Sequence, residues 1–184
     1  RMYDLDEHIR MGATIDSMKK LPPVFSKTGT VTAGNSSGIT DGAAATVLVS
    51  ERKLKEWGLK PMAKIIGYTS VGVDPSIMGI GPAPATEKVL ALTGLRLDQM
   101  DVIELNEAFA AQGLAVLRLL GLQDDDPRVN PYGGAIALGH PLGASGARLV
   151  TTATYQLQRT GGRYALCTMC IGVGQGIAVV IERV

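Results

Sequence analysis

Histidine and cysteine exchange protons most readily near neutral pH, and the chain has two of each. One histidine, His140, lies in the glycine-rich run 133–143, directly before Pro141. One cysteine, Cys170, opens a second glycine-rich run that ends at Gly176. Glycine lets a backbone approach a ligand closely, so both runs are candidate parts of a site that transfers protons.

A lone histidine is more often a packed loop residue than a catalytic group. The surroundings of His140 favour a function. Pro141 fixes the backbone beside it, glycines flank it, and a helix is expected to begin just after it. The free N–H groups of that helix's first turn could bind an anion or an oxyanion.

Cys167 and Cys170 form a C-x-x-C pattern, which could be a redox dithiol. Redox pairs of this kind usually open a helix, whereas this pair ends a strand and runs into glycines. A zinc site is also disfavoured, because two distant histidines give poor ligand spacing. We therefore expect Cys167 to be a small buried residue and Cys170 to be an exposed thiol that transfers protons.

Asn106 begins the run Asn106-Glu107-Ala108-Phe109-Ala110, where a strand is expected to end and a helix to begin. Its simplest role is to cap that helix, with Glu107 favoured at the positive helix end. A second role is to orient a water or a carbonyl, because α/β sheets bind ligands at the carboxyl ends of their strands.

Other patterns are set aside. The run 172–176 has the wrong spacing and position for a dinucleotide loop, and 124–126 is expected to be a solvated acidic loop, so no metal site is predicted. A net charge of +1 gives no electrostatic case for a nucleic-acid partner. No window is apolar enough for a membrane span, and the opening residues are polar rather than a signal peptide. With two cysteines, this favours a cytoplasmic protein.

Apolar and polar periodicity predicts a layered α/β fold, a mixed sheet covered by helices. Residues 1 to about 37 lack periodicity and look like an extended segment that rests on other chain. The expected strands are 43–49, 63–73, 101–105, 164–170 and 176–181. The expected helices are 50–57, 82–94, 107–120 and 144–158.

With these residues assembled, the chain resembles the carboxyl-terminal half of a thiolase, an acetyl-CoA acyltransferase. The family motifs are N-E-A-F at 106–109, G-H-P at 139–141 and C-x-G at 170–172. The runs 31–38 and 78–82 are also thiolase-like. The resemblance covers essentially all of the chain. It looks closest to the 3-oxoadipyl-CoA thiolases of the β-ketoadipate pathway.

The resemblance implies a domain order. Family members are roughly twice as long, with two similar βαβαβαββ halves and a loop domain inserted in the first. Residues 1–37 would be the end of the loop domain, and 38–60 the last strand and helix of the first half. Residues 61–184 would be the carboxyl-terminal thiolase domain.

The resemblance also implies roles for individual residues. Cys170 would be the acid and base, and its thiol would protonate or deprotonate the acetyl-CoA carbon. His140 would activate a nucleophilic cysteine and donate to the thioester oxyanion, with a water held by Asn106. The backbone N–H of Gly172 would form a second oxyanion hole. Coenzyme A would be a substrate, and no cofactor is implied. Positions matching those that contact the pantetheine or line the acyl pocket are Ser37, Phe109 and Met78.

The family's nucleophilic cysteine belongs to the first half, and no position here corresponds to it. The chain alone is therefore expected to be inactive, with the missing amino-terminal half and a second copy of the intact protein as partners. Tyr132 stands where the family favours a small residue or Asn, and could alter the acyl pocket. The alternatives are a non-catalytic fragment that binds coenzyme A or a partner, a biosynthetic acetoacetyl-CoA thiolase, a redox protein and a β-ketoacyl synthase relative. Cys170 argues against the last.

Overall fold

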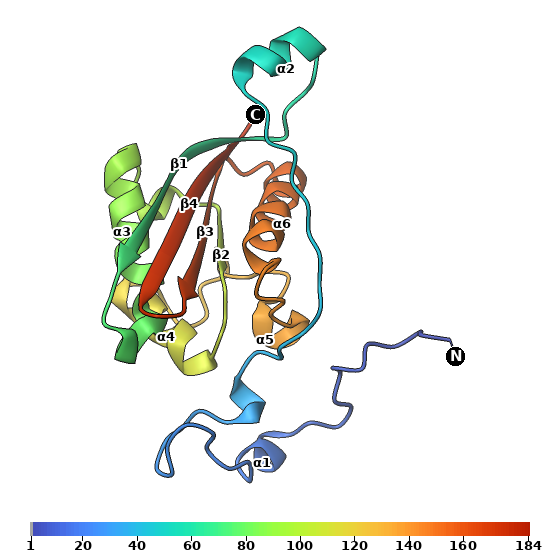
Figure 1. Ribbon diagram of the computed structural model, residues 1–184, viewed down its shortest axis with the longest axis vertical. Helices are drawn as coiled ribbons and strands as arrows, with labels where there is room; N and C mark the ends of the chain where they lie inside the picture. The colour runs from blue at the N-terminus through green and yellow to red at the C-terminus, as the bar shows by residue number, and fades with distance from the viewer. Residues whose placement is uncertain (1) are drawn as a thin grey trace.

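The computed structural model describes residues 2–184 and contains one four-stranded mixed sheet with helices on both faces (Figure 1). The strand order is β1-β4-β3-β2, with β4 antiparallel to β1 and β3, and β2 parallel to β3. The strands are β1 Ala63–Gly72, β2 Val102–Leu105, β3 Tyr164–Ile171 and β4 Gln175–Arg183. This confirms the predicted α/β fold with a mixed sheet.

The four predicted helices are present as α2, α3, α4 and α6, whereas α1 and α5 were not predicted. The α-helices are α1 Ile15–Met18, α2 Glu51–Trp57, α3 Pro82–Thr93, α4 Ala110–Leu119, α5 Ala135–Leu138 and α6 Ser145–Thr160. The 3₁₀ segments are η1 Ala33–Asn35, η2 Pro75–Ile80 and η3 Leu97–Gln99. Within residues 2–184, no helix is long and apolar enough to cross a membrane.

Local chemistry explains the ends of the longer helices. α3 begins with a proline in its first turn and ends at Gly94, whose φ of 69° is left-handed. α6 ends in the same way at Gly161, where φ is 75°. Glycine adopts this conformation without a Cβ clash, so it stops both helices before the next strand.

The core has two layers, one on each side of the sheet. On one side, Val89 of α3 packs with Ile103, Leu166 and Val180. On the other, α6 packs on Val102, Ala165, Cys167 and Ile181 through a set of apolar residues, namely Leu149, Ala153 and Leu157. The same division is visible in Figure 1, where α3 and α6 lie on opposite sides of the strands.

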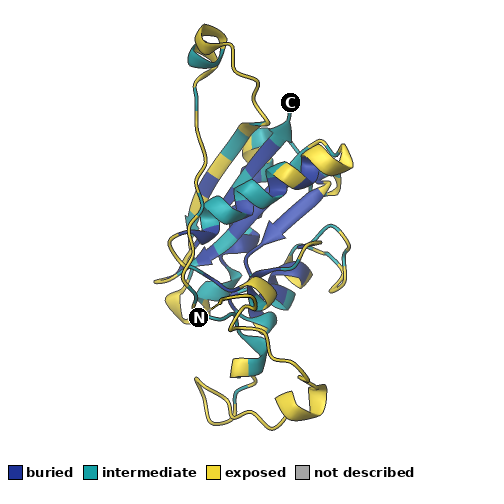
Figure 2. Cartoon of the chain, turned by 90° about the vertical axis from the view of Figure 1, so that its right-hand side faces the viewer, coloured by how far each residue is buried: buried dark blue, intermediate teal, exposed yellow. Residues whose placement is uncertain are grey.

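Residues 2–62 lie largely outside this core. Figure 2 shows that the amino-terminal segment and α2 are mostly exposed, while the buried residues concentrate in the sheet. The expected strand at 43–49 is wrong: these residues are extended, mostly exposed and form no strand. A strand needs a neighbour for its backbone N–H and C=O groups, and none runs beside this segment.

Two further expectations need correction. The helix predicted for 107–120 begins at Ala110, and its N-cap position is Phe109, so Asn106 does not cap it.

In addition, one strand of the βαβαβαββ order is reduced to a single parallel bridge between Ile103 and Val129. Asn130 extends this bridge with its side chain, because its amide accepts from Leu105 N at 2.9 Å and donates to Leu105 O at 2.8 Å. The carboxamide therefore takes the place of the next backbone peptide in the ladder.

Candidate active site

Asn106 and His140, far apart in the sequence, are in direct contact at the carboxyl end of β2. The Asn106 backbone N–H continues the sheet by donating to Thr168 O at 3.0 Å. The side chain is fully buried, and its Nδ2 lies 3.2 Å from Nε2 of His140. The structure thus joins the N-E-A-F and G-H-P motifs through one hydrogen bond between their polar side chains.

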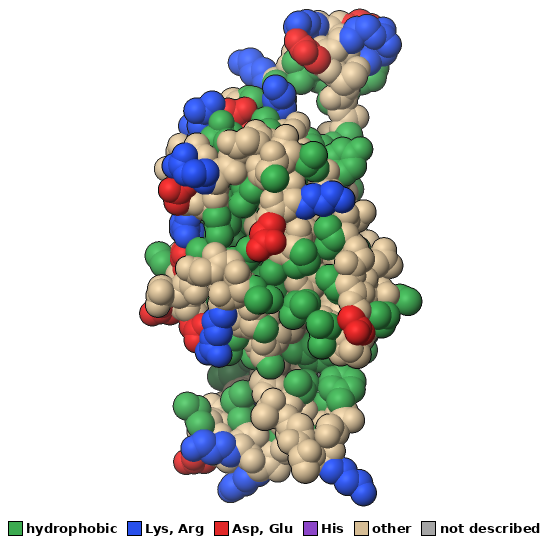
Figure 3. Space-filling view, turned by 90° about the vertical axis from the view of Figure 1, so that its left-hand side faces the viewer, with side chains coloured by type: hydrophobic (Ala, Val, Ile, Leu, Met, Phe, Trp, Pro, Cys, Tyr) green, Lys and Arg blue, Asp and Glu red, His purple; other side chains and the backbone are tan. Residues whose placement is uncertain are grey.

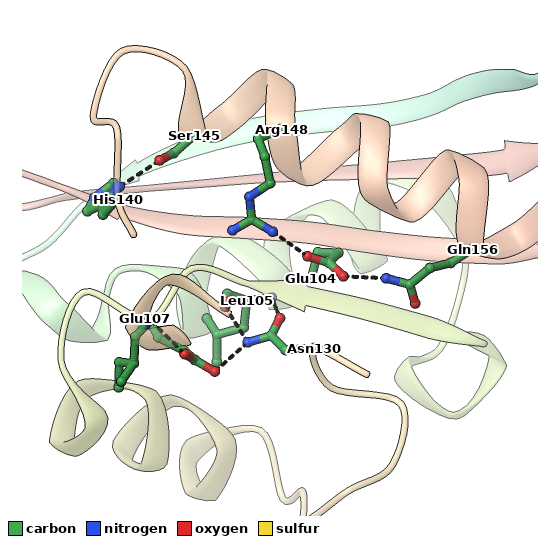
Figure 4. A network of polar contacts seen from close by, with 9 residues as sticks. Glu104, Leu105, Glu107, Asn130, His140, Ser145, Arg148 and Gln156 are labelled. Atoms are coloured by element: carbon green, nitrogen blue, oxygen red, sulfur yellow. Dashed lines mark hydrogen bonds and ion pairs between the residues drawn. The ribbon is translucent and has the colours of Figure 1, made fainter. Parts of the chain in front are cut away.

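Ser145, in the first turn of α6, fixes the other side of the His140 ring (Figure 4). The Ser145 hydroxyl donates to Pro141 O at 3.1 Å, and its oxygen lies 2.6 Å from His140 Nδ1. A hydroxyl has one proton, so Nδ1–H must donate to it. In neutral His140, Nε2 then carries the lone pair and accepts from Asn106.

Burial lowers the pKa of His140, and the nearby positive charge of Arg148 lowers it further. The imidazole is therefore favoured in its neutral form, with the lone pair on Nε2. Asn106 Oδ1 is buried and has no hydrogen-bond partner within residues 2–184. A buried acceptor of this kind suits a water or a ligand donor. The pair thus places a neutral imidazole beside an acceptor that has no partner within residues 2–184.

A short segment of the amino-terminal region connects the two motif loops. Ser37 bonds to Ala108 O through its backbone N–H at 3.0 Å and its hydroxyl at 3.1 Å. Gly38 O accepts from the His140 backbone N–H at 2.8 Å. Ser37, at a position predicted to contact pantetheine, therefore lies beside the N-E-A-F loop and next to the residue that holds His140.

Phe109 and Met78, the other predicted pocket residues, lie in different places. Phe109 forms a bridge with Ser36, and its ring meets Phe25 edge to face with centroids 5.5 Å apart. Met78 is half-buried in η2, the segment that packs on α4.

Cys170 ends β3 at the same end of the sheet from which Asn106 leaves β2, without a hydrogen bond to His140 or Asn106. It is 7% exposed, so the expectation of an exposed thiol is wrong. Burial raises the pKa of the Cys170 thiol, which stays protonated near neutral pH. Such a thiol can give a proton, and becomes a base only when a substrate or a further charged group changes its surroundings.

Cys167 is buried on the α6 side of β3, as predicted, and burial raises its pKa strongly. A disulfide between the two cysteines is not possible in this conformation. Residues three apart in a strand have Cα atoms ~10 Å apart, beyond the reach of a disulfide. Both thiols are free, and the redox hypothesis is not supported.

The glycines after Cys170 differ in what they do. A Cβ on Gly176 would lie 2.0 Å from Gly81 O, and one on Gly174 would lie 2.2 Å from Val73 O. These two glycines allow the β3–β4 turn to approach the η2 backbone. Gly172 has open space around it and is exposed, so of the three it is the one free to face a ligand.

Sequence reasoning missed the supporting polar residues. Glu107 was expected at a helix end, but its carboxylate accepts from Asn130 Nδ2 at 2.8 Å and Ile136 N at 3.1 Å. A cleft of about 640 Å³ beside α4 is lined by Glu107 and Asn130 rather than by His140 or Cys170. Among residues 2–184, no three His, Cys, Asp or Glu side chains come together as a metal would need.

Tyr132 is away from Asn106 and His140. Its ring lies against Arg159, with the guanidinium carbon 4.5 Å from the ring centroid. Arg159 is in the last turn of α6 and Ser145 in the first, which separates them by roughly 20 Å along the helix axis. The structure therefore gives no sign that Tyr132 crowds His140.

Comparison with known proteins gives the family. The carboxyl-terminal thiolase domain matches residues 59–183, and the amino-terminal thiolase domain matches residues 1–52. The chain belongs to the thiolase family. It is 64% identical over 183 residues to a beta-ketoadipyl-CoA thiolase of Acinetobacter baylyi, covering 100% of this chain and 46% of the relative.

Other relatives agree. The chain is 59% identical over 179 residues to the 3-oxoadipyl-CoA/3-oxo-5,6-dehydrosuberyl-CoA thiolase of Escherichia coli, covering 97% of this chain and 45% of that protein. The Bacillus anthracis acetyl-CoA acetyltransferase structure aligns with a TM-score of 0.91 at 47% identity, over 97% of this chain and 45% of that one. Human mitochondrial 3-ketoacyl-CoA thiolase in complex with CoA aligns with a TM-score of 0.87 at 48% identity, over 98% and 45%. The chain thus spans about half the length of these relatives.

Proposed function

We propose that this chain is the carboxyl-terminal part of a thiolase that cleaves a 3-oxoacyl-CoA with free coenzyme A, giving acetyl-CoA and a shortened acyl-CoA. The single observation that carries the proposal is the contact between Asn106 and His140, which joins two family motifs at the carboxyl end of β2. The names of the most similar relatives support 3-oxoadipyl-CoA as the substrate.

In the proposed reaction, the lone pair of His140 Nε2 leaves its hydrogen bond with Asn106 Nδ2–H and takes the proton of a nucleophilic cysteine. The resulting imidazolium then donates Nε2–H to the thioester oxyanion. Asn106 Oδ1 accepts from a water whose second proton reaches the same oxygen. Cys170 exchanges the proton on the acetyl-CoA carbon, and the Gly172 N–H stabilises the acyl-enzyme oxygen.

The remaining assignments belong to the same proposal. Ser37, Phe109 and Met78 contact coenzyme A or the acyl chain. Residues 1–37 end a loop domain, 38–60 complete the first half and 61–184 form the second half. The intact protein is a cytoplasmic homo-oligomer that uses coenzyme A thioesters and needs no other cofactor.

The chain alone is proposed to be inactive, because neither of its cysteines is placed as the nucleophile. Cys167 faces the α6 core and Cys170 has the acid and base role. The matched amino-terminal family domain ends within the first part of this chain, which supports a first half supplied by other residues. A non-catalytic fragment that binds a partner is the second candidate, favoured by exposed apolar residues in the amino-terminal part, among them Met2, Ile39, Val47 and Leu48.

The test is a thiolysis assay on the 184-residue chain, alone and mixed with the amino-terminal half of a beta-ketoadipyl-CoA thiolase. The substrates are 3-oxoadipyl-CoA and acetoacetyl-CoA, and the readout is loss of the 3-oxoacyl absorbance. Activity is expected only on mixing. It should be lost with Cys170→Ser and kept with Cys167→Ser. Turnover by the pure chain would refute the proposed inactivity, and a folded but inactive mixture would favour the non-catalytic fragment.

A further inference from the structure

A buried charge cluster lies between β2 and α6, next to the catalytic pair (Figure 4). Glu104 of β2 is fully buried. Its carboxylate accepts from Arg148 Nη1 at 2.9 Å and from Gln156 Nε2 at 2.6 Å. Burial raises the pKa of Glu104, while the Arg148 guanidinium opposes this effect. Two elements of the fold are thus joined by one carboxylate.

Core packing alone does not explain this cluster. The layer around it is apolar, and Val102 on β2 and Leu149 on α6 belong to the same buried cluster. Replacing a buried ion pair by apolar residues of similar volume is often neutral or stabilising, so such a pair adds little to stability. What the cluster adds is direction, because the two oxygens of Glu104 accept from different turns of α6, Oε2 from Arg148 Nη1 and Oε1 from Gln156 Nε2.

The periodicities of the two elements connect the cluster to the site. Glu104 and Asn106 are two apart at the end of β2 and share a face. Ser145 and Arg148 are three apart on α6 and also share a face. On β2, Glu104 forms the ion pair and Asn106 bonds to the His140 side chain. On α6, Arg148 forms the ion pair and Ser145 bonds to the His140 side chain. A slide of α6 along β2 would therefore break both sets of contacts together.

We propose that the Glu104–Arg148 ion pair is a positioning clamp, which sets the register of α6 on β2 and so keeps His140 in contact with Asn106. Neither residue touches the reacting atoms in this role. The clamp acts on the geometry of Asn106 and His140 and does not depend on which thioester the site binds. An experiment can therefore refute the clamp without refuting the proposed reaction.

Nuclear magnetic resonance of the 184-residue chain tests the clamp, because His8 and His140 are its only histidines. His8→Ala assigns the His140 imidazole nitrogens. The first variant is Glu104→Leu with Arg148→Met, which keeps side-chain volume without leaving a lone buried charge. Circular dichroism should show that it is folded. We expect the ratio of Nδ1–H to Nε2–H tautomers of His140 to fall by about fivefold or more, as loss of one hydrogen bond predicts, and the Asn106 side-chain amide signals to shift.

The matched control removes an ion pair elsewhere in the sheet. Arg163 and Glu182 join β3 to β4 at 2.8 Å, and Arg163 is largely exposed. Arg163→Met with Glu182→Leu should leave the His140 tautomer unchanged. A folded clamp variant with unchanged His140 and Asn106 signals would overturn the proposal. Should the double variant not fold, Arg148→Lys keeps the charge but removes the Nη1 donor that contacts Glu104, and the same signals decide: a shift supports the clamp and none overturns it.

Discussion

Replacing Asn130 should destabilise the protein far more than the loss of one polar side chain normally would. Asn130 has a φ of 46°, in the left-handed region, and its carboxamide holds both backbone groups of Leu105. Leu105 is 2% exposed, so water does not replace the lost bonds. Each buried backbone group left without a partner costs about 1–3 kcal/mol, and Asn130→Ala leaves two.

The backbone conformation adds a second cost. A left-handed conformation costs alanine roughly 1–2 kcal/mol, so the total for Asn130→Ala is about 3–8 kcal/mol. Asn130→Gly avoids that strain but gains unfolded-state entropy worth about 0.5–1 kcal/mol. It should therefore be destabilised by about 2–7 kcal/mol, slightly less than the alanine variant.

Urea unfolding followed by far-ultraviolet circular dichroism measures these differences. The control is Gln158→Ala, because Gln158 is exposed and donates only to Met62 O at 2.7 Å; its effect should stay within about 0.5 kcal/mol. The reasoning fails if Asn130→Ala lies within about 1 kcal/mol of the wild type. It also fails in part if the glycine variant is clearly the less stable of the two.

Three shorter predictions follow from other contacts. Gly176→Ala should destabilise the protein by more than about 2 kcal/mol in the same urea assay, because its Cβ would lie 2.0 Å from Gly81 O. In the control variant Gly72→Ala, the new Cβ has no atom within 4 Å, so its free energy of unfolding should stay close to that of the wild type. Burial lowers the pKa of His140 in the folded state, so below about pH 6.5 the unfolded chain binds a proton on this imidazole more readily than the folded chain does. The free energy of unfolding should therefore decrease as the pH falls below about 6.5. His140→Gln should show a shallower pH dependence, and an identical pH dependence would contradict the lowered pKa of His140. Both thiols are buried, so a thiol reagent should react slowly with the native chain and rapidly in urea. The pKa of Cys170 is raised less than that of Cys167, so Cys170 should react first. The variants Cys167→Ser and Cys170→Ser would show which thiol reacts.

The residues that carry the proposed chemistry were predictable because their types are rare and their loops are distinctive. His140 and Cys170 stood out in a chain with two residues of each kind. The alternation of strands and helices from Ala63 onward was equally clear, because apolar runs and glycine stops mark each element. Periodicity is a local property, so a sequence is sufficient to recognise it.

The supporting residues could not be found in this way. Arg148 in a helix that also carries other polar residues looks like a solvated side chain, and Glu104 interrupts an apolar strand without explanation. Their roles depend on what lies across the β2–α6 layer, which is a tertiary property. The Asn130-Pro131 pair is typical of a turn, but the sequence does not show that the Asn130 side chain also pairs with the backbone of β2.

The strand predicted for 43–49 is wrong for a related reason: the composition of this segment suits a strand, but backbone pairing needs a neighbouring strand. The surface of the chain points the same way. Large apolar side chains of this region are exposed, Val47 at 87% and Ile39 at 88%, and hydrophobic side chains reach the surface over much of the sheet domain in Figure 3. An exposed apolar surface of this kind agrees with the proposal that this chain is part of a longer protein.

Residues 36–39 connect the exposed amino-terminal part to the site. This segment comes from the exposed amino-terminal part, yet it bonds to Ala108 on one side and to His140 on the other. Any partner that packs on the exposed region would therefore act on the backbone of both motif loops at once. The ion pair of Glu104 and Arg148 resists such movement from within the sheet domain. The geometry of Asn106 and His140 is thus held from two directions, by an internal ion pair and by the hydrogen bonds of residues 36–39.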